Sequence, residues 1–202
     1  FGHGIWWVQI SVHQFGLPLY SFSATVTAGL VVIQSLQLAM FGPITQRLSR
    51  LSGLGFSFAV AGCWTLIEAL RSWFFTGFPW LLLGYSQTDS ILAVYAPVFG
   101  AYGVSFVCVL LAASTLGVIE NQRRYPHSIL LAVLLTAPIA LSQIDWVKPI
   151  EGGEIEVALI QGAVPQSEKW RRSMRAPSIK LYRSLSEPHF GKDLIIWPET
   201  AI

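Results

Sequence analysis

One carboxylate in this sequence lies where a catalytic base is often found. Glu199 follows the apolar run of residues 194–197, with Pro198 between the run and Glu199. Proline fixes the local backbone and helps to aim the next side chain, and the neighbouring Ile196 and Trp197 are expected to shield the carboxylate from water. Such a setting suits a general base. An ordinary acidic residue in a turn after a strand has the same spacing.

Two other sets of reactive side chains lie in apolar surroundings. Glu68 and Arg71 lie three positions apart inside an apolar run, where ionisable residues are candidates for function. The plainer interpretation is an ion pair at a helix end that reaches to the membrane interface. Cys63 and Cys108 have no polar neighbours that would favour a thiolate, so we interpret them as small packing residues; no zinc-ligand spacing and no cofactor motif is present.

Charge is distributed very unevenly along the chain. Only 12% of the 202 residues are charged and 53% are hydrophobic, whereas soluble domains carry roughly 25% charged residues. Eight of the 13 Lys and Arg and seven of the 11 Asp and Glu follow Val147. The sequence therefore predicts a membrane region over residues 1–147 and an extramembrane domain from 148 to 202. A net charge of +2 argues against a nucleic-acid partner.

A spanning helix needs about 20 mostly apolar residues, and several runs meet this requirement. The first run, residues 1–12, reads as the tail of a span. Four further spans are predicted at residues 19–41, 54–75, 94–119 and 128–144.

The positive-inside rule orients these spans. Arg47 and Arg50 follow the first complete span, and Arg123 and Arg124 lie between the third and the fourth. These two loops are expected in the cytoplasm. The aromatic-rich loop at residues 76–95 and the charged C-terminal region are then expected on the other side of the membrane.

The C-terminal region has the pattern of a strand, a helix and a buried strand. Residues 155–161 and 193–197 read as strands, and residues 167–186 have helical spacing, with Pro177 limiting how early a regular helix begins. This order is typical of a βαβ unit with parallel strands. Sites in open α/β sheets gather at the carboxyl ends of strands, where Gln161 and Glu199 lie.

Four motifs together resemble the apolipoprotein N-acyltransferase family. They are Gly77-Phe78-Pro79-Trp80, Gly84-Tyr85-Ser86-Gln87, the stretch from Gln161 to Trp170, and Trp197-Pro198-Glu199-Thr200-Ala201-Ile202. The resemblance runs nearly end to end and in the same order. It implies a polytopic α-helical membrane bundle followed by the first β-α-β of a nitrilase-like αββα domain. The Trp-Pro-Glu element alone is less specific, because it recurs across the nitrilase superfamily.

The resemblance also implies an activity and partners. The family's enzyme moves an acyl chain from a phospholipid to the N-terminal amine of a diacylglyceryl-cysteine apolipoprotein, through a cysteine thioester, in the bacterial inner membrane with its catalytic domain on the periplasmic side. Glu199 matches the glutamate of the family's Glu-Lys-Cys triad. Trp170 matches a tryptophan on an arm near the substrate entrance, and Trp80 and Tyr85 belong to a membrane loop expected to contact the lipid. A monomer is expected, with no cofactor and no metal.

The sequence departs from the family's pattern in two respects. The family's catalytic lysine and cysteine have no counterpart in these 202 residues, which we read as a fragment cut at both ends and expect to be inactive alone. Arg171 replaces a residue that is often acidic in the family. Two other interpretations remain open: a membrane-tethered nitrilase-type amidase that transfers to water, and a transporter or scaffold, for which Glu68 and Arg71 are the only charges well inside a predicted span.

Overall fold

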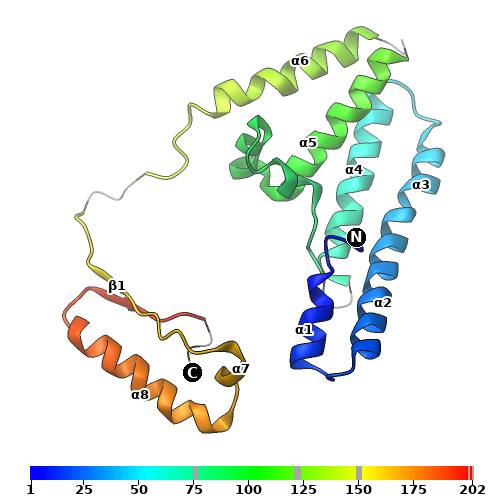
Figure 1. Cartoon of the computed structure of the whole chain (residues 1–202). Coiled ribbons are helices and arrows are strands. Elements are labelled where there is room, and N and C mark those ends of the chain that lie inside the picture. Colours follow the sequence, from blue (N-terminus) through cyan, green and yellow to red (C-terminus); the bar gives the residue numbers. More distant parts are fainter. Residues whose placement is uncertain (75–76, 121–123, 149–151, 200, 202) are drawn as a thin grey trace. The chain divides into compact units, whose positions relative to one another are not determined.

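A computed structural model describes residues 1–74, 77–120, 124–148, 152–199 and 201 (Figure 1). The predicted span end at Phe75, the cytoplasmic marker Arg123, and Thr200 and Ile202 of the last motif lie outside the described residues. The chain divides into two units, Phe1–Trp146 and Val147–Ile202. Each unit is described by itself below.

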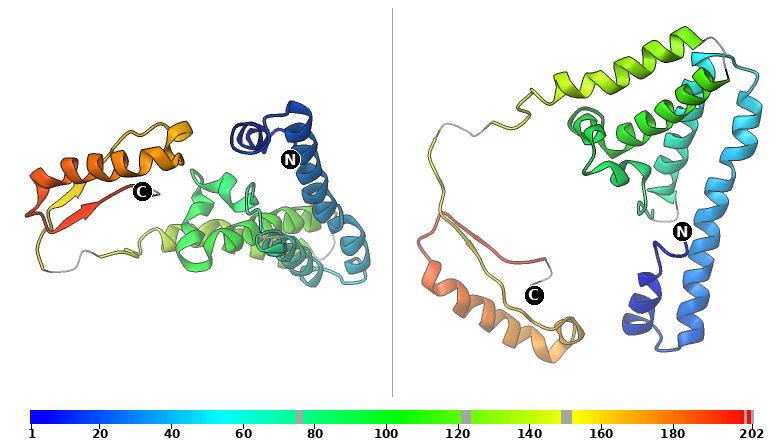
Figure 2. Two further views of the ribbon diagram at one scale, coloured as in Figure 1. Left: turned by 90° about the horizontal axis from the view of Figure 1, so that it is seen from below. Right: turned by 45° about the horizontal axis from the view of Figure 1, so that its top comes forward.

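The first unit is helical. Its α-helices are α1 (Trp7–Phe15), α2 (Tyr20–Ala39), α3 (Phe41–Leu48), α4 (Leu54–Arg71), α5 (Ala96–Ile119) and α6 (Arg124–Leu141), with the 3₁₀ turns η2 (Leu83–Gln87) and η3 (Ile91–Tyr95) before α5. α3 continues α2 almost end to end (Figures 1 and 2). Four segments of the described chain are long and apolar enough to cross a membrane: Tyr20–Leu48, Leu54–Arg71, Ile91–Ile119 and Arg124–Leu141. Their number agrees with the four complete spans predicted from the sequence.

The ends of these helices differ from the predicted ends for local reasons. α6 begins at Arg124, four residues earlier than predicted, because Pro126 lies in its first turn, where a missing N–H costs nothing. α4 ends at Arg71 because the chain turns back on itself: Gly77 has φ +81°, and the amide of Phe78 donates to the carbonyl oxygen of Arg71 at 3.0 Å. The predicted partial span at residues 1–12 is only partly helical, because the nine-residue helix α1 begins at Trp7 and ends at Phe15.

The helices of the first unit pack through both apolar and polar side chains. Val60, Ala61 and Ile67 of α4 are buried, as are Val104, Val107 and Leu110 of α5. Cys108 packs against the cluster formed by Tyr95, Val104 and Val107, in keeping with its prediction as a packing residue. On α2 the buried residues are instead Ser23, Thr27 and Gln34. Small polar residues on the inner face with apolar residues outside are typical of helices that pack within a membrane.

The second unit holds two short strands and the helices between them. β1 (Val157–Leu159) pairs in parallel with β2 (Leu194–Ile196), with Ala158 opposite Ile195. The intervening chain forms α7 (Gln166–Lys169), η4 (Arg172–Met174), α8 (Arg175–Ser186) and η5 (Glu187–His189). Residues 167–186, for which helical spacing was predicted, form separate helical segments, because the backbone of Arg171 is extended with φ −74° and ψ 131°. α8 begins at Arg175, so that Pro177 lies in its first turn.

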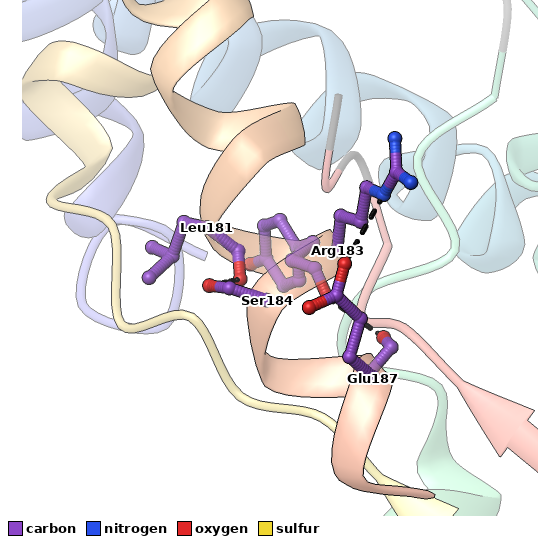
Figure 3. A network of polar contacts seen from close by, with 6 residues as sticks. Leu181, Arg183, Ser184 and Glu187 are labelled. Carbon is purple, nitrogen blue, oxygen red and sulfur yellow. Dashed lines mark hydrogen bonds and ion pairs between the residues drawn. The ribbon is translucent and has the colours of Figure 1, made fainter. Parts of the chain in front are cut away.

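A small core joins α8 to the strands. Ala158, Ile160 and Tyr182 are buried, and Ile195 and Trp197 pack against them. The rings of Tyr182 and Trp197 lie 5.3 Å apart. At its C-terminal end α8 carries an exposed polar network in which Arg183 Nε lies 3.3 Å from Glu187 Oε1 and Ser184 Oγ donates to the Leu181 carbonyl (Figure 3). This network lies on the solvated face of the helix.

Candidate functional site

Glu199 lies just beyond the carboxyl end of β2. The strand ends at Ile196, Trp197 turns inward to the core, and Pro198 and Glu199 are exposed. Pairing also continues past the end of β1, since the amide of Ile160 donates to the carbonyl oxygen of Ile196 at 2.9 Å. The carboxyl ends of the two strands therefore lie together, and Glu199 follows directly from that edge.

A direct hydrogen bond joins two of the sequence motifs at this edge. Lys169 Nζ donates to the backbone carbonyl oxygen of Glu199 at 2.9 Å. The indole of Trp197 adds a second link, because its Nε1 donates at 2.9 Å to Ser186 Oγ, which itself donates to the Tyr182 carbonyl at 2.7 Å. The Trp-Pro-Glu segment is thus bonded to both ends of the intervening helical region, through the backbone of Glu199 and the side chain of Trp197.

The prediction that Ile196 and Trp197 shield the Glu199 carboxylate from water is wrong within the part of the chain that the structure describes. The Glu199 side chain is exposed, because Trp197 packs away from it onto Tyr182. Trp170, at the C-terminal end of α7, is also exposed, with 64% of its surface accessible. A cavity of about 220 Å³ lies beside Trp170 and is lined by Lys169, Trp170, Arg171, Arg172, Arg175, Ser178 and Ala201.

The other two candidate residues, Trp80 and Tyr85, belong to the first unit and lie on the loop between α4 and α5. Trp80 stacks on Phe78, with ring centroids 5.1 Å apart, and lies 5.6 Å from the ring of Trp7. Tyr85 is exposed within η2. Aromatic side chains in such a loop suit the interface between lipid and water.

Buried charges hold this aromatic loop in place. Glu68 Oε1 accepts a hydrogen bond from the amide of Leu83 at 2.8 Å, and Arg71 Nη2 donates to the carbonyl oxygen of Leu81 at 3.2 Å. Glu68 and Arg71 are 1% and 3% exposed. The plainer interpretation of an interfacial ion pair is therefore wrong: the two side chains, both among the described residues, are buried in protein and bond to loop backbone rather than to each other.

The backbone of the loop is strained and closely packed where these bonds form. Leu81 has φ +61°, a conformation that costs free energy for a residue other than glycine. Three residues later the amide of Gly84 donates to Ser105 Oγ of α5 at 2.7 Å. A Cβ at Gly84 would lie 2.2 Å from the carbonyl oxygen of Ala101, so only glycine allows the loop to approach α5 this closely.

The candidate residues show no metal site. Among the described residues, no group of three or more His, Cys, Asp or Glu side chains is placed to hold a metal ion.

The two units occur together in known proteins of one family. Residues 1–114 match the family model described as the apolipoprotein N-acyltransferase N-terminal domain. The chain belongs to the apolipoprotein N-acyltransferase family. Proteins named apolipoprotein N-acyltransferase from Methylococcus capsulatus, Vibrio vulnificus and Pseudomonas paraeruginosa are 38%, 36% and 39% identical to it. Each alignment covers 100% of this chain but 40% of the relative, so the chain spans about two fifths of the length of these relatives.

Sequence reasoning had found the apolipoprotein N-acyltransferase motifs but not the residues that support them. Ser105 and Gly84 gave no signal beyond a small residue in an apolar helix and a glycine in a loop. The sequence did place Glu68 and Arg71 about one helical turn apart, directly before an aromatic loop. This was the one signal that could have pointed to their role in supporting the loop. Their contacts with Leu81 and Leu83 could be seen only once the loop was placed.

Proposed function

We propose that this chain is part of an enzyme that transfers an acyl chain from a phospholipid to the N-terminal amine of the diacylglyceryl-cysteine of bacterial lipoproteins. The observation that carries the proposal is family membership over both units, together with Glu199 at the carboxyl edge of the parallel strands. The strand–helix–strand of residues 157–196 is, in this proposal, the beginning of a nitrilase-like αββα domain. Four membrane-length helices suit an enzyme whose donor is a lipid.

The proposed chemistry has two steps. Glu199 accepts the proton of a cysteine thiol, and the thiolate attacks the ester carbonyl of the phospholipid. The tetrahedral intermediate collapses to a thioester, and the released lysophospholipid oxygen takes the proton from Glu199. The lipoprotein amine then attacks the thioester, Glu199 accepts a proton from the amine, and the cysteine sulfur leaves and is protonated again.

The other two members of the triad are assigned outside these 202 residues. A lysine that stabilises the oxyanion and the nucleophilic cysteine are expected in a protein of the relatives' full length. Cys63 lies in α4 and Cys108 in α5, and neither matches the family's nucleophile. The same additional residues would supply the cover that Glu199 lacks in the described chain.

Trp80, Tyr85 and Trp170 are proposed to contact the lipid substrates. Each is exposed, and aromatic side chains favour the zone of lipid headgroups. In this proposal the protein lies in the bacterial inner membrane as a monomer, with the Val147–Ile202 unit on the periplasmic side.

The proposal is tested with a protein of the relatives' length that contains this chain, purified in detergent. It is incubated with a phospholipid carrying a labelled acyl chain and with a synthetic diacylglyceryl-cysteine peptide. We expect the label on the peptide amine and one lysophospholipid released for each acyl chain transferred. Release of free labelled fatty acid with no acylated peptide would instead identify a hydrolase. The 202-residue chain alone is expected to transfer no label.

A further inference from the structure

A cluster of positive charge surrounds Trp170 in the second unit. The seven residues 169–175 contain Lys169, Arg171, Arg172 and Arg175 and no acidic residue. These four side chains, here called the basic cluster, line the cavity of about 220 Å³ beside Trp170. They converge from the end of α7, from η4 and from the first residue of α8.

The basic cluster is not neutralised by the protein in the way that neighbouring charges are. Arg183 lies 3.3 Å from Glu187 and Lys192 lies 2.9 Å from Glu156. Within the described part of the chain, by contrast, no ion pair involves Arg171, Arg172 or Arg175. Positive side chains are therefore concentrated on one surface.

The place of the cluster along α8 is unfavourable for folding alone. Arg175 is the first residue of α8, and no acidic residue lies in its first turn. The amino end of a helix carries partial positive charge, so a basic side chain there is repelled and an anion is attracted. A bound anion would relieve the repulsion between Arg175 and the start of the helix and also the repulsion among the four basic side chains. This favours a binding role for this surface.

Trp170 indicates which kind of anion this surface binds. Its indole is exposed at the centre of the basic cluster. Exposed tryptophan beside Lys and Arg is typical of surfaces that bind in the headgroup zone of a bilayer. The unit is also tied to the membrane: the fifteen residues 142–156 between α6 and β1 can extend at most about 50 Å.

We propose that the basic cluster binds the phosphate groups of anionic phospholipids at the bilayer surface, with Trp170 entering the headgroup zone. Each basic residue near an anionic surface favours binding by roughly fivefold. The inference deepens the proposed function and rests on it in one respect: Lys169 bonds to the backbone of Glu199, so a lipid held by its phosphate at the cluster lies next to the proposed base.

The test follows docking of the second unit directly. An environment-sensitive fluorophore is attached to Ser173→Cys, in the middle of the cluster, in a chain that carries Cys63→Ala and Cys108→Ala. The full 202-residue chain is reconstituted in nanodiscs of phosphatidylcholine alone or of an equal mixture with phosphatidylglycerol. We expect a blue shift of the emission only in the anionic discs. Because the Debye length falls from about 10 Å to about 3 Å between 0.1 M and 1 M salt, high salt should reverse the shift.

Two triple variants with the same change of charge separate the cluster from general attraction. Arg171→Gln, Arg172→Gln and Arg175→Gln together should lower the docked-to-undocked ratio about a hundredfold. Lys180→Gln, Arg183→Gln and Lys192→Gln, which lie outside the cavity, should leave most of the docking. Circular dichroism and the disc-bound yield check that both variants remain folded.

Three results would overturn the proposal. They are equal emission in the two kinds of disc, equal loss in the two triple variants, and an equal shift in phosphatidylcholine discs on addition of inorganic phosphate, which would assign the site to a free anion. Docking is measured without any acyl transfer. A family-length protein that docks but transfers no acyl chain would therefore contradict the proposed function and leave this inference standing.

Discussion

Glu68 and Arg71 illustrate how single residues support the aromatic loop of the first unit. Burying a polar group costs free energy unless the group is hydrogen-bonded. Glu68 forms its hydrogen bond with the backbone of Leu83, and Arg71 forms its hydrogen bond with the backbone of Leu81. Leu81 is held at φ +61° between them. The charges thus stabilise a strained loop conformation that presents Trp80 and Tyr85.

Removal of the Glu68 carboxylate should loosen this loop. In Glu68→Ala the buried amide of Leu83 loses its acceptor, which costs about 1–3 kcal/mol. Hydrogen exchange of residues 81–84 should accelerate roughly ten- to hundredfold. Glu68→Gln keeps an oxygen at the same place and is the control. Equal exchange in Glu68→Ala and the unchanged chain would show that the bond does not hold the loop.

Gly84 is expected to resist replacement because its backbone approaches α5 closely. A methyl group there would lie 2.2 Å from the carbonyl oxygen of Ala101 and would force Gly84 away from Ser105. Gly84→Ala should therefore lower the unfolding free energy by about 1–3 kcal/mol in detergent. Gly62→Ala, in open space on α4, should raise it by up to about 1 kcal/mol. A neutral result for Gly84→Ala would contradict the close packing.

At the scale of elements, α8 connects the two motifs of the second unit. Its inner face supplies Tyr182 and Ser186, and Trp197 contacts both. Gly162 is needed for the same packing, because a Cβ there would lie 2.6 Å from the Tyr182 ring. The edge that carries Glu199 thus depends on α8 as much as on the strands.

Trp197→Phe should weaken this unit. The change removes the Nε1 bond to buried Ser186 and part of the packing on Tyr182, with an expected loss of about 1–3 kcal/mol. The loss of stability is measured by hydrogen exchange of the Leu194–Ile196 amides in the reconstituted chain. Trp170→Phe, at an exposed position, should change the same exchange by less than about 0.5 kcal/mol. If the two variants were equal, Trp197 would have no structural role at this edge.

Much of the element order could be predicted from the sequence because strong patterns determine it. Long uncharged runs predicted the four membrane-length helices, and alternation of apolar segments with a basic amphipathic segment predicted two strands around a helix. The break of the helix at Trp170 was missed because no proline or glycine marks it. The roles of Glu68, Arg71, Ser105 and Gly84 depend on the path of a loop, which local patterns do not determine.

At the scale of the whole molecule, the positive-inside rule makes a prediction about orientation. Ser49 and Ser173 are exposed and Gln87 is partly exposed, so single cysteines at these positions, in a chain without Cys63 and Cys108, can react with a membrane-impermeant maleimide. In intact cells with a permeabilised outer membrane, Gln87→Cys and Ser173→Cys should be labelled and Ser49→Cys should not. The opposite pattern would reverse the orientation and place Glu199 in the cytoplasm.

The central claim is that Glu199 acts as the base in acyl transfer. The most direct measurement is the amount of hydroxylamine-sensitive acyl group on a family-length protein incubated with labelled phospholipid. Glu199→Gln should lower the rate of thioester formation at least about a hundredfold, as loss of a general base does, with membrane insertion unchanged. Glu187→Gln, which only breaks the exposed contact with Arg183, should load normally. Thioester formation at the normal rate in Glu199→Gln would show that Glu199 is not the base in acyl transfer.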